Sequence, residues 1–529
     1  MLMVDAEQLK GLSAEQLHEV TLRLIKDCTE QQSQLEAKDR SIETLTREVT
    51  FKTTKVDQLT HELAQYKRLR FGKSSEKLDA AQASLLDETL DADLAAIEEE
   101  LKQLRPPPKT DNKQQPRRAA LPADLPRVDV HHEPESTTCT CGCALKRIGE
   151  DVAEKLDYVP GVFTVERHVR GKWACAKCQT LIQAPVPAHV IDKGIPTASL
   201  LAQVMVAKYA DHLPLYRQEA IFGRAGLAIP RSTLGAWVGA CGVRLQPLVD
   251  ALKDAILAHR VLHADETPVA MLKPGTGKTH RAYLWAYTPG AFEGMKAVVY
   301  DFADSRAGQH AQEFLGEWRG ALVCDNYSGY KALLAKGIVE LHTANKSQIA
   351  EAGIQYFARL YEIERKVKDL GSDERQRIRQ ARGRPIAEAL HAWMIAQRLK
   401  VPEGSGTAKA LNYSLKRWAT LTRYLDDGSL PADNNWVENQ IRPIAVGRGN
   451  WLFAGSLRAG QRAAAVMSLI QSARLNGHDP YLYLRDVLSR LPTCRMSALE
   501  TLLPHRWRAS EAVSVLAGTG ARTVASTIA

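Results

Sequence analysis

Residues 261–272 read VLHADETPVAML, and two similar stretches follow, THRAYLWAYT (279–288) and KAVVYDFAD (296–304). Each is short, rich in β-branched and aromatic residues, and bounded by Gly, Pro or polar residues, which is the pattern of a strand. A helical pattern at 308–318 and a further apolar stretch, GALVC (320–324), come next. Strands interleaved with a helix predict a mixed sheet covered by helices, so the centre of the chain is expected to be an α/β domain.

Two aspartates lie on this predicted sheet. Asp265 interrupts the first strand, and Asp325 directly follows the last one. An acid is disfavoured within a strand unless it has a use, although an isolated Asp is more often a turn former or a helix cap. A third acid, Glu438, is expected on a helix that carries Asn434 and Arg442 on the same face, at i−4 and i+4. On its spacing alone it resembles an ordinary solvated glutamate.

Three such carboxylates would suit a pair of divalent ions. Hard cations such as Mg²⁺ or Mn²⁺ prefer anionic oxygen ligands, and two metals side by side clamp the attacking and leaving oxygens of a phosphodiester. Asp265, Asp325 and Glu438 are therefore the candidate catalytic residues, provided that they converge at one end of the sheet. We expect Asp433 to cap the helix of the glutamate and Pro443 to end or kink it.

Five of the nine cysteines fall between Cys139 and Cys178, which indicates a local metal site. Cys175 and Cys178 have the C-x-x-C spacing of a thiolate knuckle, and Cys139 and Cys141 can supply the other pair of a tetrahedral zinc site. Three further side chains are alternative ligands: Cys143, His131 and His132. Four sulfur ligands leave no open position, so this Zn²⁺ is expected to be structural. The β-prone pieces around the cysteines predict a small zinc-binding module over 131–190.

Residues 1–105 predict a long helix with a heptad repeat. Apolar side chains recur at its first core position: Leu35, Ile42, Val49, Val56 and Leu63. The second core position carries Leu45, Leu59 and Tyr66, and Lys38 and Lys52 interrupt this series. This pattern predicts a coiled coil of about four to five heptads that joins chains into a homo-oligomer. A long helix packed on its own domain is the alternative.

The predicted coil runs into RLRFGKSSEKL (68–78), a basic cluster that contains Arg68, Arg70 and Lys73. Such a cluster can contact phosphates, or it can simply face solvent. A Pro-rich linker is expected after it, over 106–130.

Residues 191–258 give the outline of a helix-turn-helix, with a glycine-containing turn between helical patterns. Thr197 and Ser232 are the expected N-caps. An ordinary helical hairpin has the same outline, so DNA binding by this region is one of two readings.

The catalytic domain is expected over 259–475, with a basic helical insertion at about 345–425. The densest arginine cluster of that insertion is RQRIRQARGR (375–384). A helical extension and a loose tail would occupy 476–529. The chain is thus expected to be a multidomain α+β protein.

The chain has 529 residues and a formal net charge of +9. The excess of Lys and Arg favours a polyanionic partner, with nucleic acid as the first choice. Neither a signal-peptide pattern nor a run of about eighteen apolar residues is found, so we expect no membrane contact and a cytoplasmic, nucleoid-associated location.

Three motifs, HADETPV (263–269), CDNYSGY (324–330) and DNNWVENQIRPIAVGRGNWLFAGS (433–456), resemble the transposases of the insertion-sequence-sixty-six (IS66) family. The resemblance covers nearly the whole chain. The basic segment after the coil, the zinc module and the helical block before the core occur in that family in the same order.

The resemblance implies an RNase H-like catalytic core with a DDE triad, in which Asp265 is the first acid, Asp325 the second and Glu438 the third. It also implies that Arg442 and Arg448 lie near the DNA or the metal site. The candidate DNA contacts are then Arg442, Arg448 and Asn434, together with Arg68, Arg70 and Lys73.

The chain departs from the family pattern at two places. A block of the type Cys-x-Ala-His-x-Arg-Arg is expected after the second acid, where GIVELHTANKSQIAEAG (337–353) runs instead. The family's Arg-Lys-Asn-Trp reads Arg448-Gly449-Asn450-Trp451. A short internal deletion and a lost lysine would leave the triad intact and remove basic residues that contact DNA.

The expected reaction is metal-dependent cleavage at the ends of a bacterial insertion sequence, followed by attack of the freed 3′-hydroxyl on target DNA. The helix-turn-helix and zinc modules would read the terminal inverted repeats, and small accessory proteins of the same element would be further partners. Two alternatives stay open: a DNA-binding protein without catalysis that represses transposition, and a structure-selective nuclease.

Overall fold

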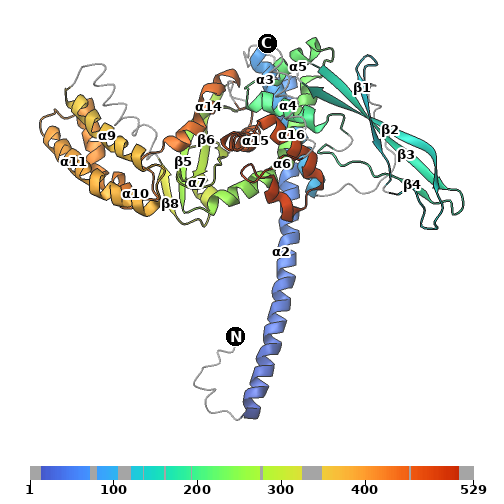
Figure 1. Cartoon of the computed structure of the whole chain (residues 1–529), viewed down its shortest axis with the longest axis horizontal. Coiled ribbons are helices and arrows are strands. Elements are labelled where there is room, and N and C mark those ends of the chain that lie inside the picture. The colour runs from blue at the N-terminus through green and yellow to red at the C-terminus, as the bar shows by residue number, and fades with distance from the viewer. Residues whose placement is uncertain are drawn as a thin grey trace. The chain divides into compact units, whose positions relative to one another are not determined.

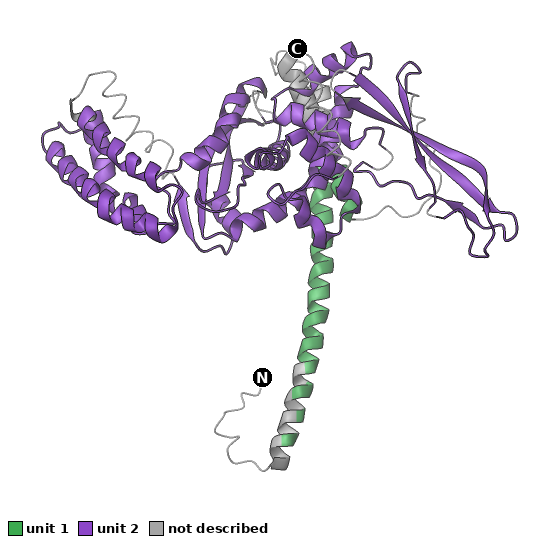
Figure 2. Ribbon diagram, viewed as in Figure 1, with its two compact units in different colours: residues 1–71, 97–115 green, residues 72–96, 116–529 purple. Residues whose placement is uncertain are grey.

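The computed structural model describes residues 14–71, 80–104, 121–134, 136–159, 162–191, 194–273, 278–324, 348–451 and 454–510 (Figure 1). The chain divides into two compact units, residues 1–71 with 97–115 and residues 72–96 with 116–529 (Figure 2). Among the described helices, none combines the length and the hydropathy that a membrane crossing requires.

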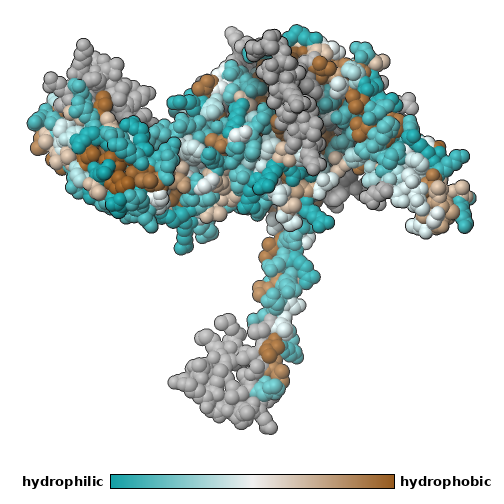
Figure 3. Space-filling model, viewed as in Figure 1, coloured by the Kyte–Doolittle hydropathy of each residue, from teal (hydrophilic) through white to brown (hydrophobic). Residues whose placement is uncertain are grey.

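The first unit is built on one helix, α2 (Ala14–Phe71), which runs for 58 residues. Apolar side chains of the heptad are exposed along it, with Leu35 55% and Val49 63% exposed. Figure 3 shows brown, apolar patches along this helix. The helix thus carries the predicted apolar stripe. The next helix, α3 (Ala80–Leu104), crosses the boundary between the two units.

A long hairpin forms the cysteine-bearing part of the second unit. Its strands are β1 (Arg127–His132), β2 (Leu145–Val159), β3 (Val162–Cys175) and β4 (Leu181–Gln183). β2 and β3 pair antiparallel, β1 lies parallel to β3, and β4 pairs with β3 near its end. Leu156 and Phe163, near the hairpin turn, are buried in the main core, and the cysteines lie at the opposite end. β1 begins within the stretch that was expected to be a linker.

Three helices follow the hairpin: α4 (Ala198–Tyr209), α5 (Leu215–Arg224) and α6 (Arg231–Leu257). Thr197 caps α4 as predicted, because its hydroxyl oxygen accepts a hydrogen bond from the N–H of Leu200. The prediction for Ser232 is wrong: α6 begins at Arg231 after Pro230, so Ser232 lies inside the first turn. The fixed φ of proline suits a helix start. Leucines of α4 and α6 share one core with the sheet that follows.

The central sheet confirms the four predicted strands. They are β5 (Val261–Lys273), β6 (Lys278–Pro289), β7 (Val299–Ala303) and β8 (Ala321–Cys324), in the order β7-β6-β5-β8. Neighbours pair antiparallel except β8, which runs parallel to β5. A parallel neighbour needs a crossover connection, and α7 (Gly308–Leu315) lies in that connection.

A helical lobe lies between β8 and the C-terminal helices. It contains α9 (Gln348–Val367), α10 (Ser372–Ile378), the π-helical turn η1 (Arg379–Gly383), α11 (Arg384–Arg398), α12 (Gly406–Lys416), α13 (Trp418–Leu421) and the 3₁₀ turn η2 (Arg423–Leu425). Leu390, Met394 and Leu411 form a small core inside the lobe. The lobe therefore has packing of its own, as an insertion requires.

The last elements are α14 (Asn435–Trp451), α15 (Leu457–Leu475), α16 (Pro480–Arg490) and the 3₁₀ turns η3 (Leu491–Thr493) and η4 (Met496–Leu502). Pro443 was expected to end or kink α14; it does not end the helix, because it lies inside it. Tertiary contacts outweigh the local cost of the proline. One of them is the close packing of Gly447 on His212, where a Cβ would lie 2.1 Å from the imidazole ring.

Helices cover both faces of the sheet. Directly paired residues share a face, so Asp265 of β5, Ala286 of β6 and Tyr300 of β7 point to the same side. On that side the hydroxyl of Tyr300 donates to the backbone oxygen of Gln440 in α14 at 2.6 Å. On the other side, Phe314 of α7 stacks on Tyr287 of β6, and Lys253 of α6 lies over the same Phe314 ring. Asp265 therefore faces the C-terminal helices.

Candidate functional site

Three alternate residues of β5 face α14: His263, Asp265 and Thr267. Side chains two positions apart point to the same side of a strand. His263 and Thr267 are each within hydrogen-bond distance of a side chain of α14 or its cap. Asp265 lies between them and is half-buried. The first candidate acid therefore sits in the middle of the strand segment that α14 covers.

Asn434 attaches the beginning of α14 to this strand. Its side-chain oxygen lies 2.8 Å from Nδ1 of His263, and its side-chain nitrogen donates to the backbone oxygen of Ala264 at 3.1 Å. The residue is 1% exposed. Asn434 was expected to contact DNA, but in the fold both ends of its amide are used inside the protein.

Asn434 is also the N-cap of α14. Its backbone oxygen accepts hydrogen bonds from the N–H groups of Val437 and Glu438, at 3.1 and 3.2 Å. The prediction that Asp433 caps the helix is off by one residue, because the Asp433 carboxylate accepts from the N–H of Asn435 in a local turn. Glu438 is exposed and lies one helical turn beyond the cap.

Arg448 attaches the other end of α14 to β5. Its guanidinium donates to the backbone oxygen of Pro268 at 2.6 Å and to the hydroxyl of Thr267 at 3.3 Å. Of the expected DNA contacts on α14, Arg442 has an exposed side chain. The side chains of Arg68 and Arg70, and Lys73 as a whole, lie outside the described residues.

The second acid, Asp325, also lies outside the described residues. The strand before it ends at Cys324, which pairs with Ala264, the residue directly before Asp265. In the helical lobe, burial raises the pKa of Tyr361 on α9, and the nearby carboxylates of Asp433 and Glu438 raise it further. Tyr361 was not singled out from the sequence, because nothing near it marks a site.

A second pair of acids occupies the opposite face of the sheet. Glu266 and Asp301 lie in one cross-strand row, with one residue of β6 between them. Glu266 forms an ion pair with Arg306. Burial raises the pKa of Asp301, and Lys253 acts in the opposite direction. Strand alternation alone predicts that Asp265 and Glu266 point to opposite faces, so only one of these neighbours can face α14.

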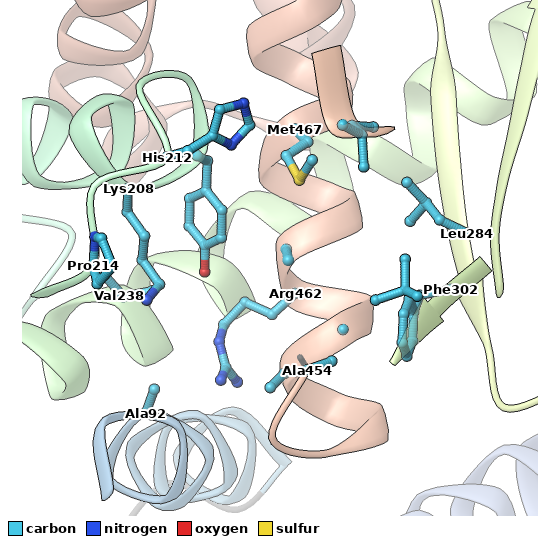
Figure 4. Close-up of a pocket in the computed structure, with 16 residues that line it drawn as sticks. Ala92, Lys208, His212, Pro214, Val238, Leu284, Phe302, Ala454, Arg462 and Met467 are labelled. Atoms are coloured by element: carbon cyan, nitrogen blue, oxygen red, sulfur yellow. The ribbon is translucent and has the colours of Figure 1, made fainter. Parts of the chain in front are cut away.

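A cavity of about 90 Å³ lies between the helices α4, α6 and α15 and the sheet (Figure 4). Most of its lining is apolar, with Leu284 and Phe302 on the sheet side. Arg462 also lines it and forms a buried ion pair with Asp93 of α3 at 2.7 Å. Neither Asp265 nor Glu438 lines this cavity, so it is separate from the carboxylates.

Two arginines of the cluster at 375–384 are buried inside the insertion. Arg379 is fully buried and bonds to both carboxylate oxygens of Glu364, at 2.9 and 2.6 Å, and to the backbone oxygen of Leu430 at 2.9 Å. Arg375 stacks on Phe292 with its guanidinium 3.5 Å from the ring centre. Arg379 thus bonds within the helical lobe and its C-terminal connection, and Arg375 contacts Phe292 in the connection between β6 and β7. Neither buried side chain is available as part of a phosphate-binding surface.

Four cysteines meet at the far end of the hairpin. Their sulfur atoms all lie within 4.8 Å of one another: Cys139, Cys141, Cys175 and Cys178. Gly142, at φ +81°, and Gln179, at φ +57°, donate their N–H groups to the backbone oxygens of Cys139 and Cys175. These turns bring each cysteine pair around one point. The hydroxyl of Thr180, with the thiol of Cys139, lowers the pKa of Cys178 to about 6, which favours the thiolate that binds metal.

Among the described residues, the group of possible metal ligands contains none of the three alternative zinc ligands. Cys143 uses its backbone oxygen to accept from the N–H of Cys139 at 2.8 Å. His132 stacks on His168, with Nε2 and Nδ1 2.9 Å apart, and His131 is exposed. Four sulfur donors around one point fit tetrahedral Zn²⁺ and leave no position for a substrate, which supports a structural zinc site.

Comparison with protein families matches the chain in four places. Residues 193–462 match the "Transposase IS66 family" and residues 136–179 the "zinc-finger binding domain of transposase IS66". Residues 58–130 match "Transposase C of IS166 homeodomain", and residues 468–505 match the "IS66 C-terminal element". The helices α4 to α6 therefore fall within the transposase match, and the homeodomain match covers the end of α2, α3 and the linker.

Relatives of similar length occur in Sinorhizobium fredii (strain NBRC 101917 / NGR234). The uncharacterized protein y4jD is 36% identical over 419 residues, which are 74% of this chain and 82% of the relative. The uncharacterized protein y4qI is 34% identical over 489 residues, 86% of this chain and 89% of the relative. A match over half of the chain, together with these relatives, shows that the chain belongs to the IS66 family of transposases, with DNA as its partner.

Proposed function

We propose that this transposase cleaves the ends of a bacterial insertion sequence and joins them to target DNA, with Asp265, Asp325 and Glu438 as its metal-binding carboxylates. The observation that carries the proposal is the attachment of α14 to β5. The helix that bears Glu438 is bonded to strand residues on both sides of Asp265. Asp325 follows Cys324, the strand partner of Ala264.

The proposal includes an RNase H-like fold for the catalytic core. Its support is the sheet, in which three antiparallel strands in chain order are extended by a fourth strand parallel to the first. Helices on both faces and a helical lobe between the second and third acids agree with this fold. Under this proposal the catalytic domain spans about 259–475, and the lobe is its insertion.

The donor set fits two Mg²⁺ or Mn²⁺ ions. Carboxylate oxygens are the ligands that these hard cations prefer, and an exposed acid such as Glu438 leaves room for water in the coordination shell. When bound, a metal pair supplies the Lewis acidity that activates water and stabilises the leaving oxygen of the phosphodiester. The task of the protein is to hold the three acids at fixed places relative to one another.

DNA recognition is assigned to three parts of the chain. Arg442 is exposed on α14, four residues beyond Glu438, where it can contact the phosphates next to the cleaved bond. Arg68, Arg70 and Lys73 fall within the homeodomain match. The zinc module is the third part. Base contacts would read the terminal inverted repeats, and the cations would supply salt-sensitive affinity.

A homo-oligomer is proposed because two element ends must be held together. The exposed apolar stripe of α2 supports it, since Leu35, Ile42 and Val49 recur every seven residues and are each more than half exposed. Such a stripe is buried when two helices form a coiled coil. Small accessory proteins of the same element would complete the assembly.

A second candidate function is sequence-specific DNA binding without catalysis, in which the protein represses transposition. It is favoured by two departures from the pattern that the family resemblance implies: Gly449 stands where a lysine is expected, and 337–353 lacks the expected basic block. Both departures would remove positive charge and leave the three acids in place.

The decisive experiment incubates the purified chain with DNA from both ends of its own element and Mg²⁺. We expect cleavage and strand transfer, which Asp265→Asn should abolish while binding to the ends is kept. Glu266→Gln is the matched control, because this neighbouring acid points to the opposite face of the sheet. Specific end binding without cleavage in Mg²⁺ or Mn²⁺ would support the non-catalytic candidate. Cleavage of branched DNA regardless of terminal sequence would indicate a structure-selective nuclease.

A further inference from the structure

We infer that His263 and Asn434 are positioning residues of the carboxylate site. Together with Arg448 they hold α14, the helix that carries Glu438, on the face of β5 that carries Asp265. The inference rests on the proposed function, because it assigns to these residues the geometry of a metal site. None of the three needs to touch the metal or the DNA. They act through the helix that carries the third acid.

The side-chain amide of Asn434 can form its two hydrogen bonds in only one orientation. Its side-chain nitrogen faces the backbone oxygen of Ala264, which cannot donate, so this end must be the NH₂ group. The other end is therefore the carbonyl oxygen, and Nδ1 of His263 must carry a proton and donate to it. The amide cannot be flipped without placing two acceptors against each other.

The imidazole of His263 also has only one arrangement of donor and acceptor that fits its neighbours. With Nδ1 protonated, Nε2 of the neutral ring is an acceptor, and the N–H of Ala291 points at it from 3.3 Å. Every polar atom of the pair is thereby matched with a partner of the opposite kind. His263 is fully buried and Asn434 is 1% exposed. A buried and fully matched network holds its members in one geometry.

This network of hydrogen bonds holds the N-terminal end of α14 on β5. Asn434 is the N-cap of α14, so the rotation of the helix about its axis is fixed from this residue onward. Glu438 lies four residues later, on nearly the same side of the helix. At the far end, Arg448 bonds to Thr267 and Pro268 of the same strand. The helix is attached on both sides of Glu438 to residues on both sides of Asp265.

The two acids are therefore held in place by different kinds of contact. Asp265 is placed by a strand in the middle of a sheet, so its position follows from the backbone pairing of β5. Glu438 is placed by a helix that can slide or turn over the sheet unless side chains fix it. Residues that orient metal ligands commonly affect metal affinity by about 10- to 100-fold although they do not bind the metal. His263 and Asn434 have this role here.

The experiment compares Asn434→Ala with Gln440→Ala. Both residues are buried amides associated with α14, but Gln440 bonds to Trp436 of its own helix and to Gln471 of α15, away from β5. We expect both variants to lower the melting temperature to a similar degree. Only Asn434→Ala should weaken the binding of Mn²⁺ to the DNA-free chain, measured by calorimetry, by about tenfold or more. It should also reduce element-end cleavage without a loss of end binding.

Two further variants keep the inference testable if Asn434→Ala does not fold. Arg448→Gln removes the attachment at the partly exposed end, and we expect a smaller loss of Mn²⁺ affinity with a folded chain. Asn434→Asp keeps the shape but places an oxygen against the carbonyl of Ala264, so it should also bind Mn²⁺ more weakly than Gln440→Ala does.

Mn²⁺ binding distinguishes failure of the positioning role from failure of the proposed metal site. If the unaltered chain binds Mn²⁺ and Asn434→Ala, Asn434→Asp and Arg448→Gln bind it as tightly as Gln440→Ala, these residues are merely structural and the inference is overturned. If the unaltered chain binds Mn²⁺ no better than Asp265→Asn does, the proposed function fails, and the inference falls with it.

Discussion

The cysteine cluster and the proposed carboxylate site differ in how the chain builds them. The four cysteines come from the two sides of one hairpin end and lie within forty residues of sequence. Asp265 and Glu438 are more than 170 positions apart, and a helical lobe with its own core lies between them. The first site is local, and the second depends on tertiary contacts.

The difference determines what each site can withstand. The cysteine site needs two tight turns and a short piece of sheet, so damage to it should stay at the hairpin end. The carboxylate site needs α14 to be held on β5 and the insertion to keep its shape. Substitutions far from the acids should therefore also weaken metal binding at the proposed carboxylate site.

The largest expected effect is the loss of zinc on replacing one cysteine ligand. Cys178→Ser should release the metal, because a structural zinc site contributes about 10–16 kcal/mol of apparent binding free energy in small metal-dependent folds. Zinc content measures the loss, and hydrogen exchange should report lost protection at 136–146 and 172–183 only. Cys143→Ser is the control and should retain zinc. Melting of the main core together with the hairpin end would contradict the view that this site is local.

A smaller effect is expected inside the insertion. Arg379→Ala leaves the partly buried Glu364 carboxylate and the carbonyl of Leu430 without the fully buried guanidinium that pairs with them, so it should lower the free energy of unfolding by about 3–5 kcal/mol. Arg377 pairs with Glu374 at the surface of the same cluster, and Arg377→Ala should leave the free energy of unfolding almost unchanged. Urea unfolding measures both. Equal effects would mean that the cluster is a surface feature after all.

The contact of α14 with His212 provides the next test. Gly447→Ala places a methyl group against the His212 ring, and overpacking of this kind costs about 1–3 kcal/mol. Gly449→Ala, two residues later, meets open space and should stabilise the helix by about 0.5–1 kcal/mol. Thermal melts of the two variants should shift in opposite directions. A shift in the same direction would show that α14 is not pressed on its neighbour at this point.

The smallest effect concerns DNA. Gly449→Lys restores the charge that the family pattern carries, at a position with room for a side chain. One added phosphate contact should steepen the salt dependence of element-end binding by about one unit in the slope of log K against log salt. Gly449→Gln, which adds length without charge, should leave the slope unchanged. An unchanged slope for the lysine variant would place this position away from the DNA.

The sequence predicted best the features that depend on neighbours in the chain. The four strands and the helix of the central domain follow from short apolar runs, and the cysteine cluster follows from the spacing of its two pairs. Thr197 is the correct cap for α4 because an N-cap is chosen within one turn.

The features that depend on remote residues were not predicted. Arg375 and Arg379 resemble a basic surface in the sequence, and their burial requires backbone oxygens from more than forty residues away. Pro443 does not end α14, because contacts at both ends keep the helix on the sheet. Asn434 resembles a surface amide until the fold brings His263 to it. The role of Asp325 and the loss of a basic block after it remain predictions, because Asp325 and residues 337–347 lie outside the described ranges and residues 348–353 belong to α9.

The central claim is that acids from β5, from the end of β8 and from α14 form one metal site. Anomalous diffraction from crystals soaked in Mn²⁺ tests it most directly, because each bound ion gives its own peak. We predict two neighbouring peaks ligated by Asp265, Asp325 and Glu438. Peaks that never include Glu438, at Mn²⁺ concentrations that support DNA cleavage, would contradict the account.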